Sequence, residues 1–131
     1  MRMIKLYTAA GAEQTPTDEG VYTLANGTTY YAELFNDAEN TVGWSIHYNW
    51  SAALVAAITV EKSNRPQRSI TPYASSGWGT TSAPTVSAAA SAAETFVEYD
   101  GDMGYRRRLK IVVTTGGTLS AFEHSKSRGA R

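Results

Sequence analysis

Alternation of large apolar and polar side chains most limits the folds open to this chain. In VGWSIHYNW, residues 42–50, every second residue from Trp44 to Trp50 is large and apolar, and polar residues stand between them. A period of two places successive side chains on opposite faces of a β-strand. The same alternation runs through ALVAAITVEKS (53–63) and TTYYAELF (28–35). These three segments are predicted to be strands that bury one face.

Two dipeptides predict hairpins between further short strands. Asn26-Gly27 is a strong hairpin signal, and Gly116-Gly117 stands between two runs rich in β-branched and apolar residues. The further strands expected beside them are VYTLA (21–25), LKIVVTT (109–115) and TLSAFEHS (118–125), and MIKLYTA (3–9) is another short candidate.

The middle of the chain is less regular. Residues 64–84 hold three of the four prolines, which favours an extended loop or an irregular edge strand. In residues 85–100 the alanines favour a helix, whereas Thr85, Val86 and the run TFVEYD favour two short strands around a Ser/Ala turn. We prefer strands. Seven to nine short strands with no convincing helix predict an all-β protein: an antiparallel sandwich, a jelly roll or a small barrel.

Length and composition predict one domain over residues 1–131 and exclude several chemistries. The chain has no cysteine and two histidines far apart, so no metal site is predicted. No serine lies in a nucleophile-elbow sequence. We therefore expect no catalytic residue, no cofactor and no enzymatic activity. Because no signal peptide or membrane-length apolar segment is present, we expect synthesis in the cytoplasm and no membrane partner.

Charge is distributed unevenly although the net charge is zero. Residues 1–61 carry seven acids and two bases, a net −5, whereas residues 62–131 carry ten bases and five acids, a net +5. Such asymmetry suits a subunit that packs head to tail or lies on a charged neighbour. A chance distribution is the alternative.

Three consecutive arginines, residues 106–108, begin the strand before Gly116. In an extended strand Arg106, Arg108 and Lys110 point one way, and Arg107 points with the core-facing residues. A pI near 6.7 and the absence of an RNA-binding motif disfavour direct nucleic-acid binding. Carboxylates of a protein partner are preferred, and a merely solvated strand face is the alternative. The predicted contact residues are Arg106, Arg107, Arg108 and Lys110, with Arg65 and Arg68 if the middle loop packs nearby.

Aromatic residues outside the predicted core suggest a binding surface. Trp78, between two glycines in SSGWGTT (75–81), is the candidate anchor; a tryptophan folded back over the end of the sandwich is the alternative. Tyr73, Tyr99 and Tyr105 are also expected in loops or on outer faces.

The runs GYRRRLKIVVTTGGTLSAFEHSK (104–126) and WSIHYNWSAALVAAITVEKSN (44–64) resemble the cement, or decoration, proteins of some short-tailed bacteriophage capsids. The resemblance covers the last quarter of the chain well, the second run loosely and the N-terminal part hardly at all. It implies a jelly roll without enzymatic activity, on the outside of the virion capsid. The implied partners are the major capsid protein and further copies in a dimer or trimer. The two ends, MRMIKLY and HSKSRGAR, would then be arms that order on assembly.

On this interpretation the arginines and Lys110 contact the shell or another copy, and Trp78 is an anchor. Charge reversal at Arg106 and Arg108 is expected to weaken shell binding without unfolding the domain. The main alternative is a carbohydrate-binding or host-recognition module of a phage tail, with Trp78, Tyr73 and Tyr99 as a sugar platform. A coat protein of a small RNA phage is disfavoured because those chains end in paired helices.

Overall fold

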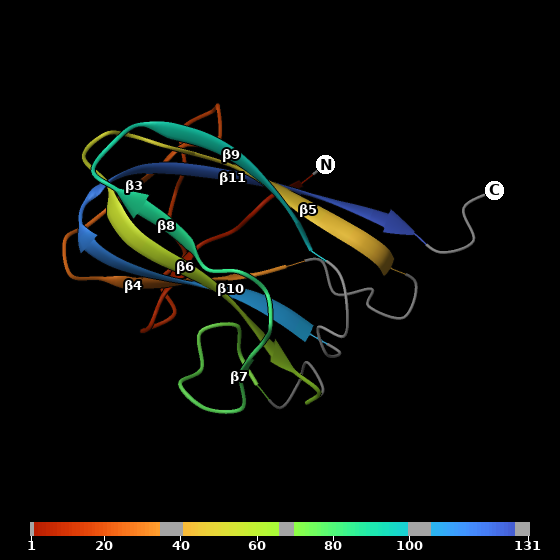
Figure 1. The fold of residues 1–131 in the computed structure, drawn as a ribbon. Coiled ribbons are helices and arrows are strands. Elements are labelled where there is room, and N and C mark those ends of the chain that lie inside the picture. The colour runs from red at the N-terminus through yellow and green to blue at the C-terminus, as the bar shows by residue number, and fades with distance from the viewer. Residues whose placement is uncertain (1, 35–40, 66–69, 100–105, 128–131) are drawn as a thin grey trace.

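Two antiparallel sheets pack face to face in the computed structural model, which describes residues 2–34, 41–65, 70–99 and 106–127 (Figure 1). All regular secondary structure in these residues is β-strand. Sheet I contains β1 (Arg2–Met3), β3 (Tyr22–Leu24), β5 (Thr41–Trp50), β9 (Ala93–Tyr99) and β11 (Gly117–Ser127). Sheet II contains β2 (Tyr7–Thr8), β4 (Thr29–Glu33), β6 (Val55–Ser63), β7 (Gly79–Thr80), β8 (Val86–Ala89) and β10 (Arg106–Thr115).

The strand order is that of a jelly roll. In sheet I the order is β3-β11-β5-β9, and in sheet II it is β4-β10-β6-β8. The pairs β3–β11, β4–β10, β5–β9 and β6–β8 form one long antiparallel ribbon that alternates between the sheets. Eight strands wrapped in this way define the double-sheet jelly roll. The predicted all-β sandwich of jelly-roll type is therefore confirmed.

Both predicted hairpins are wrong. Asn26-Gly27 joins β3 to β4 and Gly116-Gly117 joins β10 to β11, and in each case the two strands lie in opposite sheets. The second pair of glycines instead allows close approach of backbone. A Cβ on Gly116 would overlap the carbonyl oxygen of Leu24, and one on Gly117 would lie 2.7 Å from the backbone nitrogen of Leu54. The turn is an arch over the end of the sandwich.

The apolar faces predicted from alternation do form the core. Trp44 and every second residue to Trp50 are buried, as is the corresponding set from Leu54 to Val60. Two tyrosines place their hydroxyl groups in this interior, where Tyr48 Oη and Tyr99 Oη are hydrogen-bonded at 3.0 Å. Burial raises the pKa of both phenols, that of Tyr48 well above its ordinary value.

The N-terminal segment belongs to the sandwich, so the expectation that it is an arm is wrong. β1 pairs with β11, and Ile4 and Leu6 are fully buried. At the other end β11 continues to Ser127, and residues 128–131 lie outside the described part. No helix in the described residues is long and apolar enough to cross a membrane.

The segment of residues 85–100 folds as preferred, and residues 64–84 combine the two alternatives left open for them. Residues 86–99 form β8 and β9 around a turn in which Ala90 has a φ of 57°. In the described part of residues 64–84, the only strand is the two-residue edge strand β7, so this proline-containing region is a largely irregular segment beside β6. Residues 70–81 of this segment, termed the covering loop below, contact the predicted arginine site.

Candidate functional site

The predicted basic stripe on β10 is a buried ion-pair cluster. β10 runs between β4 and β6, and Arg108 lies directly opposite Glu33 on one side and Glu61 on the other. Arg108 Nε donates to Glu61 Oε1 at 2.8 Å, and its Nη2 lies 2.6 Å from the same oxygen. Arg106 Nε donates to Glu33 Oε2 at 2.6 Å. The exposed fractions of Arg106 and Arg108 are only 0% and 3%.

The covering loop buries these two side chains. Arg106 Nη1 donates to the carbonyl oxygen of Ile70 at 2.7 Å. Arg108 Nη1 donates to the carbonyl oxygens of Pro72 and Ala74 at 2.9 and 2.7 Å. Because loop carbonyls have no ladder partner of their own, guanidinium donors satisfy them well. The two arginines therefore tie the irregular segment to the outer face of sheet II.

The ring of Trp78 also covers Arg106 and Arg108. The Cζ atoms of Arg106 and Arg108 lie 5.2 and 4.7 Å from the centroid of its ring, and Arg108 also lies 4.2 Å from that of Tyr31. The indole Nε1 donates to the carbonyl oxygen of Thr71 at 3.1 Å. Cation–π contacts gain strength when the cation is desolvated. Trp78 thus folds back over the sandwich, which is the alternative to the anchor role considered from the sequence.

Arg107 points in the opposite direction, between the sheets. Its Cζ lies 5.0 Å from the centroid of the Trp44 ring, and the residue is 4% exposed. Burial lowers the pKa of Arg107, and the negative charge of Glu123 acts against that shift. Glu123 is itself buried and accepts a 2.6 Å hydrogen bond from Arg2 Nε. The interior thus holds charged groups supplied by β10 and β11, and the exposed Arg2 of β1 pairs with Glu123 from outside.

The expectation of an accessible basic stripe is therefore wrong for residues 106–108. A charge reversal at Arg106 or Arg108 would place a carboxylate beside Glu33 or Glu61, so we now expect this change to destabilise the domain. Of the other predicted contact residues, Arg65 is exposed and Lys110 is half-buried. Arg68 lies outside the described residues.

The charge asymmetry between the two halves of the chain is matched inside the fold. Two ion pairs each join an acid before position 62 to a base after it: Glu33 to Arg106, and Glu61 to Arg108. The pair between Arg2 and Glu123 has the opposite sense. The first two pairs give a structural reason for part of the asymmetry that needs no charged neighbour.

The predicted sugar platform does not form. Tyr99 is buried and stacks on Trp44, with ring centroids 4.2 Å apart and an interplanar angle of 14°. Tyr73 packs against Tyr7, with centroids 5.7 Å apart. Trp78 lies over the arginines, and Tyr105 is outside the described part of the chain.

Sequence reasoning missed the outer face of sheet I, where an aromatic row crosses the strands. Phe122 on β11 lies opposite His47 on β5, which lies opposite Phe96 on β9. The rings of His47 and Phe96 stack with centroids 4.0 Å apart and an interplanar angle of 12°. Met3 on β1 extends the row beyond Phe122. Phe96 is 68% exposed, which is unusual for a phenylalanine on a strand.

Rows of polar residues flank these aromatic residues on both sides. One row is Ser120, Asn49 and Glu94, and the other is His124, Ser45 and Glu98. Asn49 Nδ2 donates to Glu94 Oε2 at 3.4 Å, and His47 Nε2 lies 3.2 Å from the same oxygen. The face therefore combines exposed aromatic carbon with carboxylates. The run ETFVE (94–98) carries the only local signal of this surface, because its alternation places both glutamates and Phe96 on one side.

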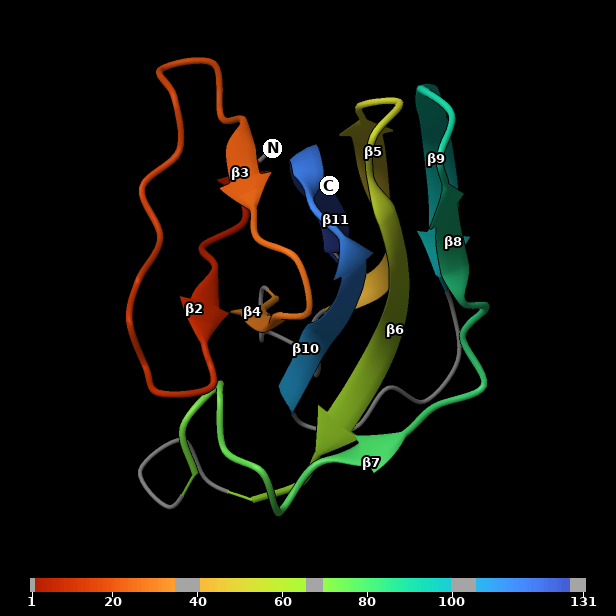
Figure 2. The same cartoon turned by 90° about the vertical axis from the view of Figure 1, so that its left-hand side faces the viewer.

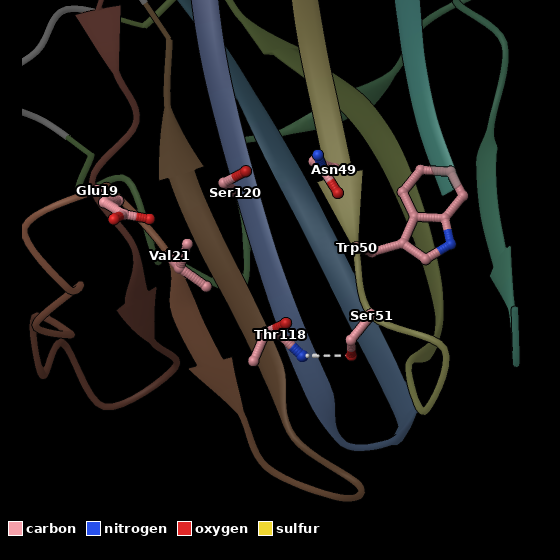
Figure 3. Close-up of a pocket in the computed structure, with 7 residues that line it drawn as sticks. All are labelled: Glu19, Val21, Asn49, Trp50, Ser51, Thr118 and Ser120. Carbon is pink, nitrogen blue, oxygen red and sulfur yellow. Dashed lines mark hydrogen bonds between the residues drawn. The ribbon is translucent and has the colours of Figure 1, made fainter. Parts of the chain in front are cut away.

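A pocket of about 330 Å³ adjoins the first of these polar rows (Figure 3). Thr118 N donates to Ser51 Oγ at 2.9 Å at its lower end. The residues described contain no group of three His, Cys, Asp or Glu side chains that could hold a metal ion. The pocket is lined by Glu19, Val21, Asn49, Trp50, Ser51, Thr118 and Ser120.

Comparisons with known proteins leave the family open. No protein-family model matches the sequence, and a search of curated proteins finds no significant match. Among solved structures, the chain is similar to the enzymatically active domain of tailspike protein 4 of bacteriophage CBA120, with a TM-score of 0.49 and 11% sequence identity. The match covers 94% of this chain and 18% of that one, so this chain spans less than a fifth of the length of that protein.

Proposed function

We propose that this chain is a capsid cement protein of a bacteriophage, which binds the outer surface of the icosahedral head and clamps neighbouring major capsid subunits. Its role is structural and not enzymatic. It acts as a dimer or trimer on the exterior of the virion, with the major capsid protein as its partner. No cofactor takes part.

The jelly-roll strand order is the observation that carries this proposal. It is the fold that the resemblance of residues 44–64 and 104–126 to cement proteins implies, and it now extends over the N-terminal part, where the sequence resemblance fails. The buried ion pairs on both sides of β10 support a mechanical role, because they tie β4, β6 and the covering loop into one block.

The proposed mechanism is preferential binding. A protein that binds the expanded shell and not its precursor stabilises the expanded state by about 2.7 kcal/mol per site at a free concentration of one hundred times Kd. Many symmetric sites multiply this effect over a head. Among the predicted contact residues, Arg65 and Lys110 retain access to solvent and are the proposed shell contacts.

Co-sedimentation tests this function. Heads are assembled from the major capsid protein of the genome that encodes this chain, and the purified chain is added to expanded and unexpanded heads. We expect saturable binding at a fixed ratio to capsid protein, with at least ten-fold preference for expanded heads. Failure to bind either form would overturn the proposal. Binding that survives unchanged in the double variant Arg65→Glu, Lys110→Glu would remove those two residues from the contact but leave the function standing.

A further inference from the structure

Strand β9 forms one edge of sheet I. Its only strand neighbour in the described part of the chain is β5, and Figure 2 shows it at the margin of the sandwich, beside β8 and far from β2 and β3. An unpaired edge presents backbone N–H and C=O groups to any strand that approaches. Folded proteins usually protect such an edge, so the side chains on it indicate what it accepts or rejects.

Three side chains of β9 point outward: Glu94, Phe96 and Glu98. The phenylalanine is the most exposed large apolar residue among those described. Its ring is supported from behind by His47, so it offers a flat apolar surface of fixed orientation. Two carboxylates, one on each side along the strand, frame that surface.

A second copy of the chain does not fit this edge in the register that pairs the phenylalanines. Antiparallel pairing of β9 with itself about Phe96 places Glu94 of each copy opposite Glu98 of the other. Like charges directly opposite each other destabilise a strand pair. The same geometry favours a strand with an apolar residue between two cationic ones, since each cation then lies opposite a carboxylate.

The arginine cluster beneath the covering loop shows how such a partner would be held. Arg106 and Arg108 each combine an ion pair to a glutamate with a contact to the face of Trp78. Phe96 with Glu94 and Glu98 is the same kind of acceptor, aromatic carbon beside carboxylate. Yet the ion pairs and cation–π contacts found in the described residues include no lysine or arginine at any of the three.

We infer that the β9 edge docks an arginine-bearing strand of a partner protein by strand addition. Main-chain hydrogen bonds along the edge supply affinity, and the Glu94–Phe96–Glu98 surface selects the sequence Arg-x-apolar-x-Arg. That the partner is the shell protein rests on the function proposed above. Nucleic acid is disfavoured because the two carboxylates repel phosphate.

The test uses the full chain and a seven-residue peptide, Thr-Arg-Thr-Val-Thr-Arg-Thr, capped at both ends. Paired antiparallel with β9, its valine lies opposite Phe96 and its arginines opposite Glu94 and Glu98. The matched peptide carries glutamine in place of both arginines. Binding is followed by NMR, since the backbone amides of β9 report where the peptide lies.

We expect the arginine peptide to shift the amide signals of residues 93–99 and the glutamine peptide to bind about two- to thirty-fold more weakly, the range for loss of two exposed ion pairs. The double variant Glu94→Gln, Glu98→Gln should lose the same factor for the arginine peptide. Glu19→Gln, which removes a carboxylate from the pocket on the same face, should change nothing. Unchanged melting temperatures establish that both variants are folded.

Several results would overturn the inference: no shift at millimolar peptide, equal affinity for the two peptides, or shifts that map away from β9. Displacement of the peptide by a neutral oligosaccharide would assign the face to a sugar instead. The two proposals fail separately. Peptide binding at β9 without head binding contradicts the cement function alone, whereas head binding that is unaffected by Glu94→Gln, Glu98→Gln contradicts the docking edge alone.

Discussion

Replacing Arg108 by methionine tests whether the arginines of β10 hold the fold together. The substitution keeps an unbranched apolar stem but removes the guanidinium. Glu61 then loses its cation, and the carbonyl oxygens of Pro72 and Ala74 lose their donors. The side chain of Glu61 is only 13% exposed, so water replaces the lost partner poorly.

The expected cost follows from that burial. Removal of one partner from a buried ion pair destabilises a protein by about 3–5 kcal/mol, because the remaining charge is uncompensated. Domains of this kind unfold with a total of about 5–15 kcal/mol, so the loss is a large fraction. With a urea m-value of about 1–3 kcal/mol/M, the unfolding midpoint should fall by roughly 1–5 M.

Urea unfolding followed by tryptophan fluorescence measures this loss directly. Arg65→Met is the matched control, since Arg65 is exposed and its replacement should cost less than about 0.5 kcal/mol. The double variant Arg108→Met, Glu61→Met should recover part of the stability because no orphaned carboxylate remains. If Arg108→Met shifts the midpoint no further than Arg65→Met does, the arginine cluster is not structural and the reasoning is refuted.

Two further predictions concern the core and the arch. Burial raises the pKa of Tyr48 and Tyr99, so the folded state keeps protons that the unfolded chain releases, and stability should fall as the pH rises above about 10. Urea unfolding midpoints at pH 8 and pH 10.5 measure this fall, and Tyr48→Phe should make it smaller. A midpoint that does not depend on pH would contradict the prediction. Gly116→Ala should destabilise the protein by about 1–3 kcal/mol, because the new methyl group overlaps a backbone carbonyl. Gly43→Ala is the matched control and should be neutral or slightly stabilising, because no atom lies within 4 Å of its new methyl group. Equal melting temperatures of the two variants would show that the arch is not tight.

Strands were predictable from the sequence because alternation is a local signal. The buried faces of residues 44–50 and 54–60 follow from it directly. Pairing was not predictable in the same way. Gly116-Gly117 between two strands is typical of a hairpin, but the two strands separate into opposite sheets, where each pairs with strands more than 45 positions away along the chain for most of its length.

The burial of the arginine side chains was also not predictable from local sequence. Alternation correctly placed Arg106 and Arg108 on the outer face of their sheet. Their burial depends on carbonyl oxygens of the covering loop, 34 to 36 positions away, and no local pattern indicates where that loop packs. The aromatic row was not predicted for a related reason. Phe122, His47 and Phe96 lie side by side only because of the register of three strands.

A cryo-electron microscopy map of expanded heads assembled with this chain tests the proposed function most directly. The account predicts density for the jelly roll at fixed symmetry positions on the outer surface, bridging neighbouring capsid subunits, with the β9 edge against a capsid strand and Arg106–Arg108 inside the domain. A lattice with no such density, from a sample in which the folded chain is present in excess, would contradict it.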